Sequence, residues 1–375
     1  MVDAASLTEE QMAAIKCFHS PSPDNSVFVV TGGPGSGKTT VIEYLQSGFD
    51  DVKQLIAAPT GCAVNRIKEA TGLDAHVISK IDYSSSLIRD YRGCVLIIDE
   101  ASLASVDDTA SLLASLSPIK LVVIGDENQL PCIGSPSLLS TMLAASEDGG
   151  IPVVRLTKNL RQVSAGGDGL IRTIATIGRP EWQGPVIDNT FRVHVFETKE
   201  EALNAAANAF TKKTQMLGFT KDVKTRLNEL TANSGVRRVV CTRNVYKPKT
   251  DDMFVPNGMS GIINKNDVVE YANGVKDKKN KKGKYKTLFD DARCMTIHKA
   301  EGSEFREHGI IVPDWTKGGI RADIVYTALS RFKKSAAIYG DREVVNATLS
   351  AVFPPPIVDK DAVEMLKRVK YLQTE

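Results

Sequence analysis

The chain has 375 residues, of which 42% are hydrophobic, 6% aromatic and 25% charged, with 47 basic and 45 acidic side chains. Since single hydrophobic cores stop growing at roughly 250 to 300 residues, we expect two domains. The composition is typical of a soluble globular protein and excludes a disordered chain, and no apolar run approaches the ~20 residues of a membrane-spanning helix.

The cysteines and the N-terminal residues indicate in which cellular compartment the protein is expected. The 6 cysteines are scattered and form no Cys-x-x-Cys pair, which argues against zinc fingers and disulfide scaffolds. Residues 1–6 lack the basic and then apolar segments of a secretory signal. We therefore expect an intracellular protein of a reducing compartment, cytoplasm or nucleus, with no signal peptide or transmembrane segment.

The charge is unevenly distributed, although the formal net charge is only +2. Residues 1–160 carry 11 basic and 19 acidic side chains, whereas residues 231–299 carry 15 basic and 7 acidic ones. Such asymmetry indicates that the later segment faces a polyanion while the acidic part has another task.

Short apolar strands alternate with longer helical segments along the first part of the chain. The predicted strands lie at residues 27–31, 55–58, 94–98 and 121–125. This alternation predicts an α/β fold with a parallel sheet that is covered on both faces.

The same pattern returns after residue 190 and predicts a second α/β domain. Its candidate strands lie at residues 191–196, 236–242, 294–296, 309–312 and 336–339. We expect the first domain at 1–158, the second at 159–352, and a C-terminal tail and helix at 353–375.

Two segments interrupt the α/β pattern. Residues 77–93 form a short arm, with room only for a stub or a hairpin that could act as a strand-separating pin. Residues 247–290 are rich in turns and short strands, and we expect a small β-rich insertion there. Within it, residues 276–286 include seven lysines in eleven positions, which form either a solvated tip or a contact with a polyanion.

The strand at 27–31 leads into Gly-Gly-Pro-Gly-Ser-Gly-Lys-Thr at 32–39, which fits the phosphate-binding pattern G-x-x-x-x-G-K-[ST]. Glycines let such a loop point its N–H groups at phosphates, and Lys38 adds a charge for the β and γ oxygens. The alternative is a glycine-rich turn with an incidental lysine, which the strand and helix on either side disfavour. The predicted nucleotide contacts are Gly33, Pro34, Gly35, Ser36, Gly37, Lys38, Thr39 and Thr40.

Acidic and amide residues follow two further predicted strands. Asp99 follows the strand at 94–98 and is placed to hold Mg²⁺ together with the Thr39 hydroxyl, and Glu100 to deprotonate the attacking water. The alternative is a solvated acidic pair that caps a helix beginning at residue 101 or 102. After the strand at 121–125, the amide of Gln129 is placed to sense a γ-phosphate.

Taken in order, these motifs resemble those of superfamily 1 helicases of the B-type, RecD-like, 5′ to 3′ branch. The resemblance continues in Ala-Pro-Thr-Gly-Cys-Ala at 58–63, in residues 125–131 and 295–305, and in Val-Tyr-Thr-Ala-Leu-Ser-Arg at 325–331. It implies two RecA-like domains with ATP in the cleft between them, ATP and Mg²⁺ as ligands, and helicase or translocase activity on single-stranded nucleic acid.

The resemblance also implies roles for single residues. Gln11 would read the adenine edge, and Arg161 and Arg331 would act on the γ-phosphate, Arg331 as the arginine finger. Gly302 and Glu304 belong to the motif that links nucleic acid to nucleotide. The implied contacts with the strand are Pro59, Thr60, Gly61, His76, Thr242, Asn244, Thr296, His298 and Lys299.

Two positions depart from the family pattern. Glu301 stands where the family usually has glutamine, and Leu160 where many relatives have an aromatic residue that stacks on the base. We expect Glu301 to weaken or tune stimulation by nucleic acid, and recognition of adenine to rest on Gln11.

Several alternatives stay open at this point. The chain could act on DNA or RNA, as a remodelling NTPase of an RNA virus replicase, or as a binding scaffold with a vestigial ATPase. A phosphate-loop kinase or GTPase is disfavoured, because it needs no second α/β domain. The compact build also suits a viral or phage enzyme. We expect a monomer with no membrane partner, or a part of a larger replication complex or polyprotein.

Overall fold

The computed structural model describes residues 7–20, 26–45, 52–147, 150–160, 167–246, 253–278 and 289–364. The chain divides into two compact units. The first unit comprises Met1–Arg161 and Pro355–Glu375, and the second comprises Gln162–Pro354. Each unit contains a parallel sheet of its own, which confirms the predicted α/β fold class.

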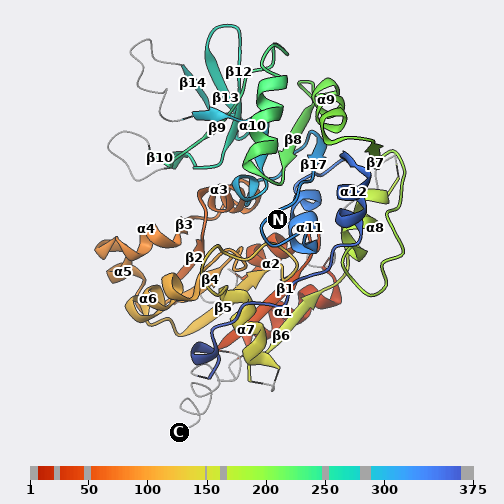
Figure 1. Cartoon of the computed structure of the whole chain (residues 1–375). Helices are drawn as coiled ribbons and strands as arrows, with labels where there is room; N and C mark the ends of the chain where they lie inside the picture. The colour runs from red at the N-terminus through yellow and green to blue at the C-terminus, as the bar shows by residue number, and fades with distance from the viewer. Residues whose placement is uncertain are drawn as a thin grey trace. The chain divides into compact units, whose positions relative to one another are not determined.

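The first unit is built on a 6-stranded parallel sheet in the order β3-β2-β4-β5-β1-β6. In Figure 1 its helices are drawn in red, orange and yellow around these strands. The strands are β1 (Val27–Gly32), β2 (Gln54–Ala58), β3 (Ala75–Val77), β4 (Val95–Ile98), β5 (Lys120–Gly125) and β6 (Val153–Leu156). The helices are α1 (Glu9–His19), α2 (Lys38–Leu45), α3 (Gly61–Thr71), α4 (Ile78–Asp82), α5 (Ser85–Tyr91), α6 (Val106–Leu116) and α7 (Leu138–Ser146).

Side-chain caps fix where these helices begin. Thr8 and Gln11 form a reciprocal capping box at the start of α1, so two backbone N–H groups are satisfied at once. Thr60 caps α3 by accepting a hydrogen bond from Ala63 N (3.2 Å), and Gly72 ends that helix with φ of 73°. The helices therefore start directly after the strands that precede them, which keeps the strand ends and helix starts together.

One core cluster of the first unit lies between a face of its sheet and the helices α4, α6 and α7. Leu96, Ile98 and Val123 from the sheet pack with Leu139 and Met142 of α7. Val363 belongs to the same cluster. The backbone N–H of Asp359 donates to Thr141 Oγ1 (3.2 Å), so the described part of the C-terminal segment returns to the first unit.

The second unit contains a 5-stranded parallel sheet in the order β16-β8-β17-β18-β7. Its strands are β7 (Phe191–Phe196), β8 (Thr214–Gly218), β16 (Cys294–Thr296), β17 (His308–Val312) and β18 (Ala336–Asp341). The helical segments are α8 (Gly169–Thr176), α9 (Lys199–Ala209), α10 (Lys221–Leu230), η3 (His298–Ala300), α11 (Ala322–Ser330) and α12 (Arg342–Leu349).

A 5-stranded antiparallel sheet, in the order β14-β13-β12-β9-β15, forms the second part of this unit. Its strands are β9 (Arg238–Cys241), β12 (Ser260–Ile263), β13 (Val268–Tyr271), β14 (Lys276–Lys278) and β15 (Phe289–Asp291), and a separate pair is formed by β10 (Val245–Tyr246) and β11 (Met253–Val255). The prediction that the strand at 236–242 belongs to the second α/β sheet is wrong. Because β9 pairs with β12 and β15 on either side, it forms the centre of the β-rich part instead.

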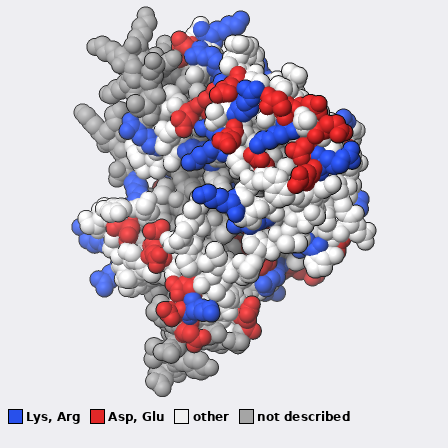
Figure 2. All heavy atoms as spheres, in the orientation of Figure 1, with Lys and Arg blue, Asp and Glu red and all other residues white. Residues whose placement is uncertain are grey.

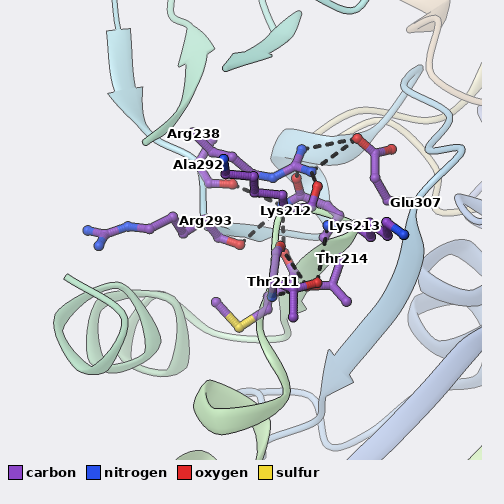
Figure 3. Close-up of polar contacts among 10 residues, drawn as sticks. Thr211, Lys212, Lys213, Thr214, Arg238, Ala292, Arg293 and Glu307 are labelled. Atoms are coloured by element: carbon purple, nitrogen blue, oxygen red, sulfur yellow. Dashed lines mark hydrogen bonds and ion pairs between the residues drawn. The ribbon is translucent and has the colours of Figure 1, made fainter. Parts of the chain in front are cut away.

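A buried arginine joins the two sheets of the second unit. Arg238 of β9 donates to Glu307 Oε1 (3.1 and 3.2 Å), to Lys212 O (2.9 Å) and to Gln215 Oε1 on β8 (3.3 Å). Figure 3 shows its guanidinium directed at Glu307. The amide of Gln215 in turn donates to the carbonyl oxygens of Ala292 (2.9 Å) and Arg293 (3.3 Å). The antiparallel sheet is thus fixed to the parallel sheet by charge-assisted hydrogen bonds.

The predicted strands of the first unit are confirmed, but the sequence reading missed β3, β6 and β8. These strands are short or contain polar residues, such as Thr214 and Gln215 in β8. The arm at 77–93 contains two short helices, α4 and α5, which lie beside β3 in Figure 1. Tyr83 at their junction is 91% exposed.

The surface carries charges of both signs. Figure 2 shows basic and acidic side chains close together over the region of α9 and α10, where Arg226 pairs with Glu200 (2.6 Å). Of the predicted lysine-rich stretch at 276–286, residues 279–286 lie outside the described residues, and Lys276 pairs with Glu270 (3.4 Å). No helix among the described residues is long and apolar enough to cross a membrane.

Candidate active site

The loop between β1 and α2 has the shape that phosphate binding requires. Gly35 and Gly37 have φ of 81° and 87°, in the left-handed region that favours glycine. The Lys38 ammonium donates to the carbonyl oxygens of Gly32 (2.6 Å) and Gly33 (3.1 Å), which holds the charge against the loop. The loop therefore presents backbone N–H groups, a helix start and a cation together.

Gln11 and Leu160 lie directly against this loop. The buried Gln11 amide donates to Gly37 O (3.3 Å) and accepts from Thr8 N (2.9 Å). A Cβ on Gly37 would lie 2.2 Å from Gln11 Nε2 and 3.1 Å from Leu160 Cδ1, so this position has room only for glycine. Leu160 is 41% exposed, and its N–H donates to Gly35 O (2.7 Å). Gln11, which is predicted to read the adenine edge, therefore lies beside the phosphate loop. Leu160, which stands where many relatives have an aromatic residue, lies beside it as well.

Asp99 and Glu100 follow β4 and are buried. The alternative of a solvated pair that caps a helix is wrong, because the next helix, α6, begins only at Val106 and is capped by Ser105. Glu100 has φ of 53°, a left-handed conformation that is uncommon for a residue with a side chain. Its backbone is fixed by a hydrogen bond from Ala101 N to Ile124 O of β5 (2.9 Å).

Arg66 of α3 contacts both carboxylates and was not identified from the sequence. Its guanidinium donates to Glu100 Oε1, and the same nitrogen lies 3.6 Å from Asp99 Oδ2. Burial and the neighbouring Glu100 raise the pKa of Asp99, while Arg66 and Lys38 oppose this shift. Two buried carboxylates at the end of a strand are oxygen donors of the kind that a hard cation such as Mg²⁺ prefers.

Gln129 lies after β5, the strand between β4 and β1. Its amide donates to Asp126 Oδ2 (3.1 Å), and Asp126 Oδ1 accepts from Asn128 N (3.1 Å). Both side chains are buried. Because β4, β5 and β1 are adjacent and parallel, the phosphate loop, the acid pair and Gln129 all follow the same edge of the sheet.

The candidate arginine finger in the second unit is held by its own helix end. Arg331 caps α11, where it donates to Thr327 O (3.2 Å), Ser303 O (3.3 Å) and Ser330 Oγ (3.1 Å). Glu304 pairs with Lys333 (2.6 Å), and Gly302 has φ of 72°. The motif at 295–305 and the one at 325–331 are therefore in direct contact within this unit. Arg161 lies outside the described residues.

Lys299 and Asn244, two residues predicted to contact the nucleic acid, both bond Asn257, which was not predicted as a contact. The Lys299 ammonium donates to Asn257 Oδ1 (2.7 Å), and Asn257 N donates to Asn244 Oδ1 (2.8 Å). In the sequence, Asn257 belongs to the segment 247–290, which is rich in turns and short strands. The structure makes Asn257 the link between the β-rich part and the segment that follows β16.

The other predicted strand contacts lie near strand ends. Thr296 Oγ1 accepts from Lys299 N (3.4 Å), and Thr242 directly follows β9. Burial lowers the pKa of His298, and Arg321 lowers it further. In the first unit, Pro59, Thr60 and Gly61 connect β2 to α3, and His76 is on the neighbouring β3 beside Ala57.

Comparison with known proteins agrees with this arrangement. A family model described as an AAA domain matches residues 6–180. The RecD subunit of the RecBCD enzyme of Mycolicibacterium smegmatis is 24% identical over 416 residues, covering 91% of this chain and 72% of the relative. The ATP-dependent RecD2 DNA helicase of Deinococcus radiodurans is 27% identical over 167 residues, which is 42% of this chain and 22% of that protein.

A solved structure shares the fold over nearly the whole chain. The Pif1 helicase from Bacteroides, in complex with ADP-AlF3 and single-stranded DNA, is similar with a TM-score of 0.56 and 18% identity, over 97% of each chain. The chain is similar in sequence to RecD subunits over most of its length, which supports a RecD-like superfamily 1 helicase. The RecD and RecD2 relatives indicate that the helicase is a nucleic-acid-dependent ATPase.

Proposed function

We propose that the helicase uses ATP to move 5′ to 3′ along single-stranded DNA and to unwind duplexes ahead of it. The observation that supports this proposal most is the position of Lys38, Asp99 and Glu100 along one edge of a parallel sheet. A protein that only bound nucleic acid would need neither a phosphate loop nor a buried acid pair.

Each residue of the site has a chemical role in the proposed hydrolysis. Lys38 and the loop N–H groups bind the β- and γ-phosphates, and Thr39 and Asp99 would hold Mg²⁺, which neutralises phosphate charge when bound. Glu100 accepts a proton from the attacking water, and Gln129 senses the γ-phosphate. Arg331, and Arg161 with it, stabilise the charge that develops on the transferred phosphoryl group, an effect of roughly 10³ to 10⁵ in rate.

The strand is bound through its backbone and not through its bases. Hydroxyl, amide and ammonium groups at Thr60, Thr242, Asn244, Thr296 and Lys299 are suited to phosphate oxygens, and they carry no base-specific pattern. We add Asn257 to this set because it holds Lys299 (2.7 Å). The other candidates for strand contact are Pro59, Gly61, His76 and His298.

Action on RNA, as in a viral replicase, is the alternative that we favour less. The RecD2 relative carries DNA helicase in its name, and the Pif1 structure contains single-stranded DNA. We therefore expect poly(dT) to stimulate ATP hydrolysis more than poly(U) does.

The proposal is tested by ATPase assays with and without poly(dT) or poly(U). We expect stimulation by poly(dT) and loss of turnover in Lys38→Ala, with the fold retained by circular dichroism. Hydrolysis that persists in Lys38→Ala would contradict the assignment of the site, and a wild type with no hydrolysis would support the vestigial scaffold.

We also propose that the helicase works as a monomer in a reducing compartment, alone or within a replication complex. Burial raises the pKa of the Cys94 thiol to about 11 and raises that of Cys294 as well, so neither thiol forms a reactive thiolate near neutral pH. Size-exclusion chromatography with light scattering, with and without a dT oligonucleotide, would test the monomeric state.

A further inference from the structure

Arg66 connects the general base to the helix that begins at the proposed strand contact. The residue is on α3, and its guanidinium bonds Glu100 Oε1 while lying 3.6 Å from Asp99 Oδ2. Its side chain is 25% exposed, whereas those of Asp99 and Glu100 are almost fully buried. Arg66 can therefore transmit a movement of α3 at the surface to the buried pair of Asp99 and Glu100.

Helix α3 is suited to transmit such an event as one rigid element. It begins after the cap Thr60, in the segment 59–61 that we propose contacts the strand, and Arg66 follows the cap by about 9 Å of helix. Ala63, Val64 and Ile67 bury its inner face in the first unit. A small shift of the helix start therefore moves the guanidinium as well.

The contact with Arg66 limits what Glu100 can do as a base. A carboxylate oxygen that accepts a hydrogen bond from a guanidinium has that lone pair engaged, and the bond is a strong, charge-assisted one. To take a proton from water, the carboxylate has to turn an oxygen to the water. The bond to Arg66 restrains this turn.

We propose that Arg66 is a positioning residue that restrains Glu100 until the strand binds at the start of α3. Strand binding shifts α3, loosens the contact between Arg66 and Glu100, and so raises the rate of hydrolysis. This inference rests on the proposed function, since it assigns to Arg66 the stimulation of ATP hydrolysis by single-stranded DNA.

The test compares steady-state ATP hydrolysis of the full chain with and without poly(dT), in the wild type, Arg66→Met and Arg66→Lys. Methionine keeps much of the apolar part of the arginine side chain and removes the hydrogen-bond donor. Lysine keeps the positive charge on a shorter side chain. Asn65→Ala is the matched control, because Asn65 is on the same helix and bonds only Glu69 Oε1 (2.6 Å) among the contacts described here. Nucleotide binding is measured separately with a fluorescent ADP analogue.

We expect Arg66→Met to raise the DNA-independent kcat by about tenfold, the factor associated with one hydrogen bond between charged groups, and to reduce the stimulation ratio accordingly. The stimulated kcat and the affinity for the ADP analogue should change little. Arg66→Lys should lie between the wild type and Arg66→Met, and Asn65→Ala should match the wild type.

An unchanged stimulation ratio in Arg66→Met, or a fall of basal and stimulated kcat by the same factor, would overturn the inference. If Arg66→Met does not fold, the stimulation ratio of Arg66→Lys tests the inference instead, because lysine keeps the positive charge beside the acid pair. A wild type that lacks DNA-stimulated hydrolysis would instead contradict the proposed function, so the two failures are distinguishable.

Discussion

At the scale of single residues, Asn257 has contacts that suit a role in binding the strand. Its Oδ1 accepts from Lys299 Nζ (2.7 Å), and its backbone N–H donates to Asn244 (2.8 Å). Asn257→Ala removes the side-chain contact with Lys299 and keeps the backbone N–H that donates to Asn244. We expect the affinity for a dT oligonucleotide to fall about fivefold, since one such hydrogen bond contributes on the order of 1 kcal/mol. Fluorescence anisotropy measures this affinity.

The matched control for this substitution is Asn204→Ala, which removes another exposed asparagine of the second unit, bonded to Glu200 O (2.8 Å). Its DNA affinity should equal that of the wild type. Equal affinity in Asn257→Ala would remove Asn257 from the proposed strand contacts.

Asp188 provides a prediction about pH. Burial opposes its ionisation, but hydrogen bonds from the Thr190 hydroxyl and from the N–H groups of Gly169, Thr190 and Phe191 lower its pKa to about 2. The unfolded carboxylate has a pKa of about 3.9, so the unfolded chain binds this proton more readily. The stabilisation by Asp188 is therefore complete above pH ~4 and is lost as the pH falls toward ~2.

Asp188→Asn should lower the midpoint of urea unfolding at pH 7, and this difference from the wild type should shrink as the pH falls to 3. The exposed Glu181→Gln serves as the control. A difference that stays constant between pH 7 and pH 3 would mean that the charge of Asp188 does not stabilise the fold.

The sequence identified those site residues whose role follows from their neighbours in the chain. The phosphate loop and the acid pair after β4 belong to this class, because a strand, a loop and a helix start fix them locally. Arg66 does not, because its contact with Glu100 joins residues 34 positions apart. From the sequence alone, Arg66 is indistinguishable from any other charged residue on a helix surface. Asn257, followed by Gly258, is typical of a turn.

At the scale of elements, the junction between the two sheets of the second unit depends on Arg238. Arg238→Met would leave Glu307 without the two hydrogen bonds from this guanidinium, which are drawn in Figure 3. We expect a loss of about 1 to 3 kcal/mol in the free energy of unfolding, because buried acceptors lose their donor while the partly exposed Glu307 stays hydrated. Urea unfolding measures this loss, and hydrogen exchange should locate it in the antiparallel sheet.

Arg237→Met is a closely matched control for this change. The adjacent Arg237 forms an exposed ion pair with Asp267 (2.7 Å), which is worth at most about 1 kcal/mol. Equal losses in the two variants would contradict the anchoring role of Arg238.

We propose that the arm formed by α4 and α5 acts as the strand-separating pin. Tyr83 at its junction is 91% exposed, so Tyr83→Ala removes no buried contact and should leave the stability unchanged. We expect slower unwinding of a tailed duplex with normal ATPase stimulation by poly(dT). Ile133→Ala, which alters another exposed apolar residue of the first unit, is the control, and normal unwinding by Tyr83→Ala would exclude this role.

The strand that the sequence did not predict and the strand that it assigned to the wrong sheet have separate physical causes. β8 begins with Thr214 and Gln215 and ends at Gly218, so it lacks the apolar run of a buried strand. β9 has such a run, yet its partners are β12 and β15. Strand pairing is decided by long-range contacts, which the local pattern does not contain.

At the scale of the whole molecule, the account combines two units with different contributions. The first unit carries the phosphate loop, the acid pair and Gln129, and the second unit carries Arg331 and the cluster of Asn244, Asn257 and Lys299. The near-neutral net charge of +2 does not exclude a polyanionic partner, because the basic excess is concentrated in residues 231–299.

Unwinding of 5′-tailed and 3′-tailed DNA duplexes, compared with matched RNA duplexes, measures both the polarity and the substrate of the helicase. We expect ATP-dependent unwinding of the 5′-tailed DNA, little unwinding of the 3′-tailed DNA or of RNA, and none with Lys38→Ala. Unwinding that prefers a 3′ tail, or that proceeds equally with Lys38→Ala, would contradict the proposed function.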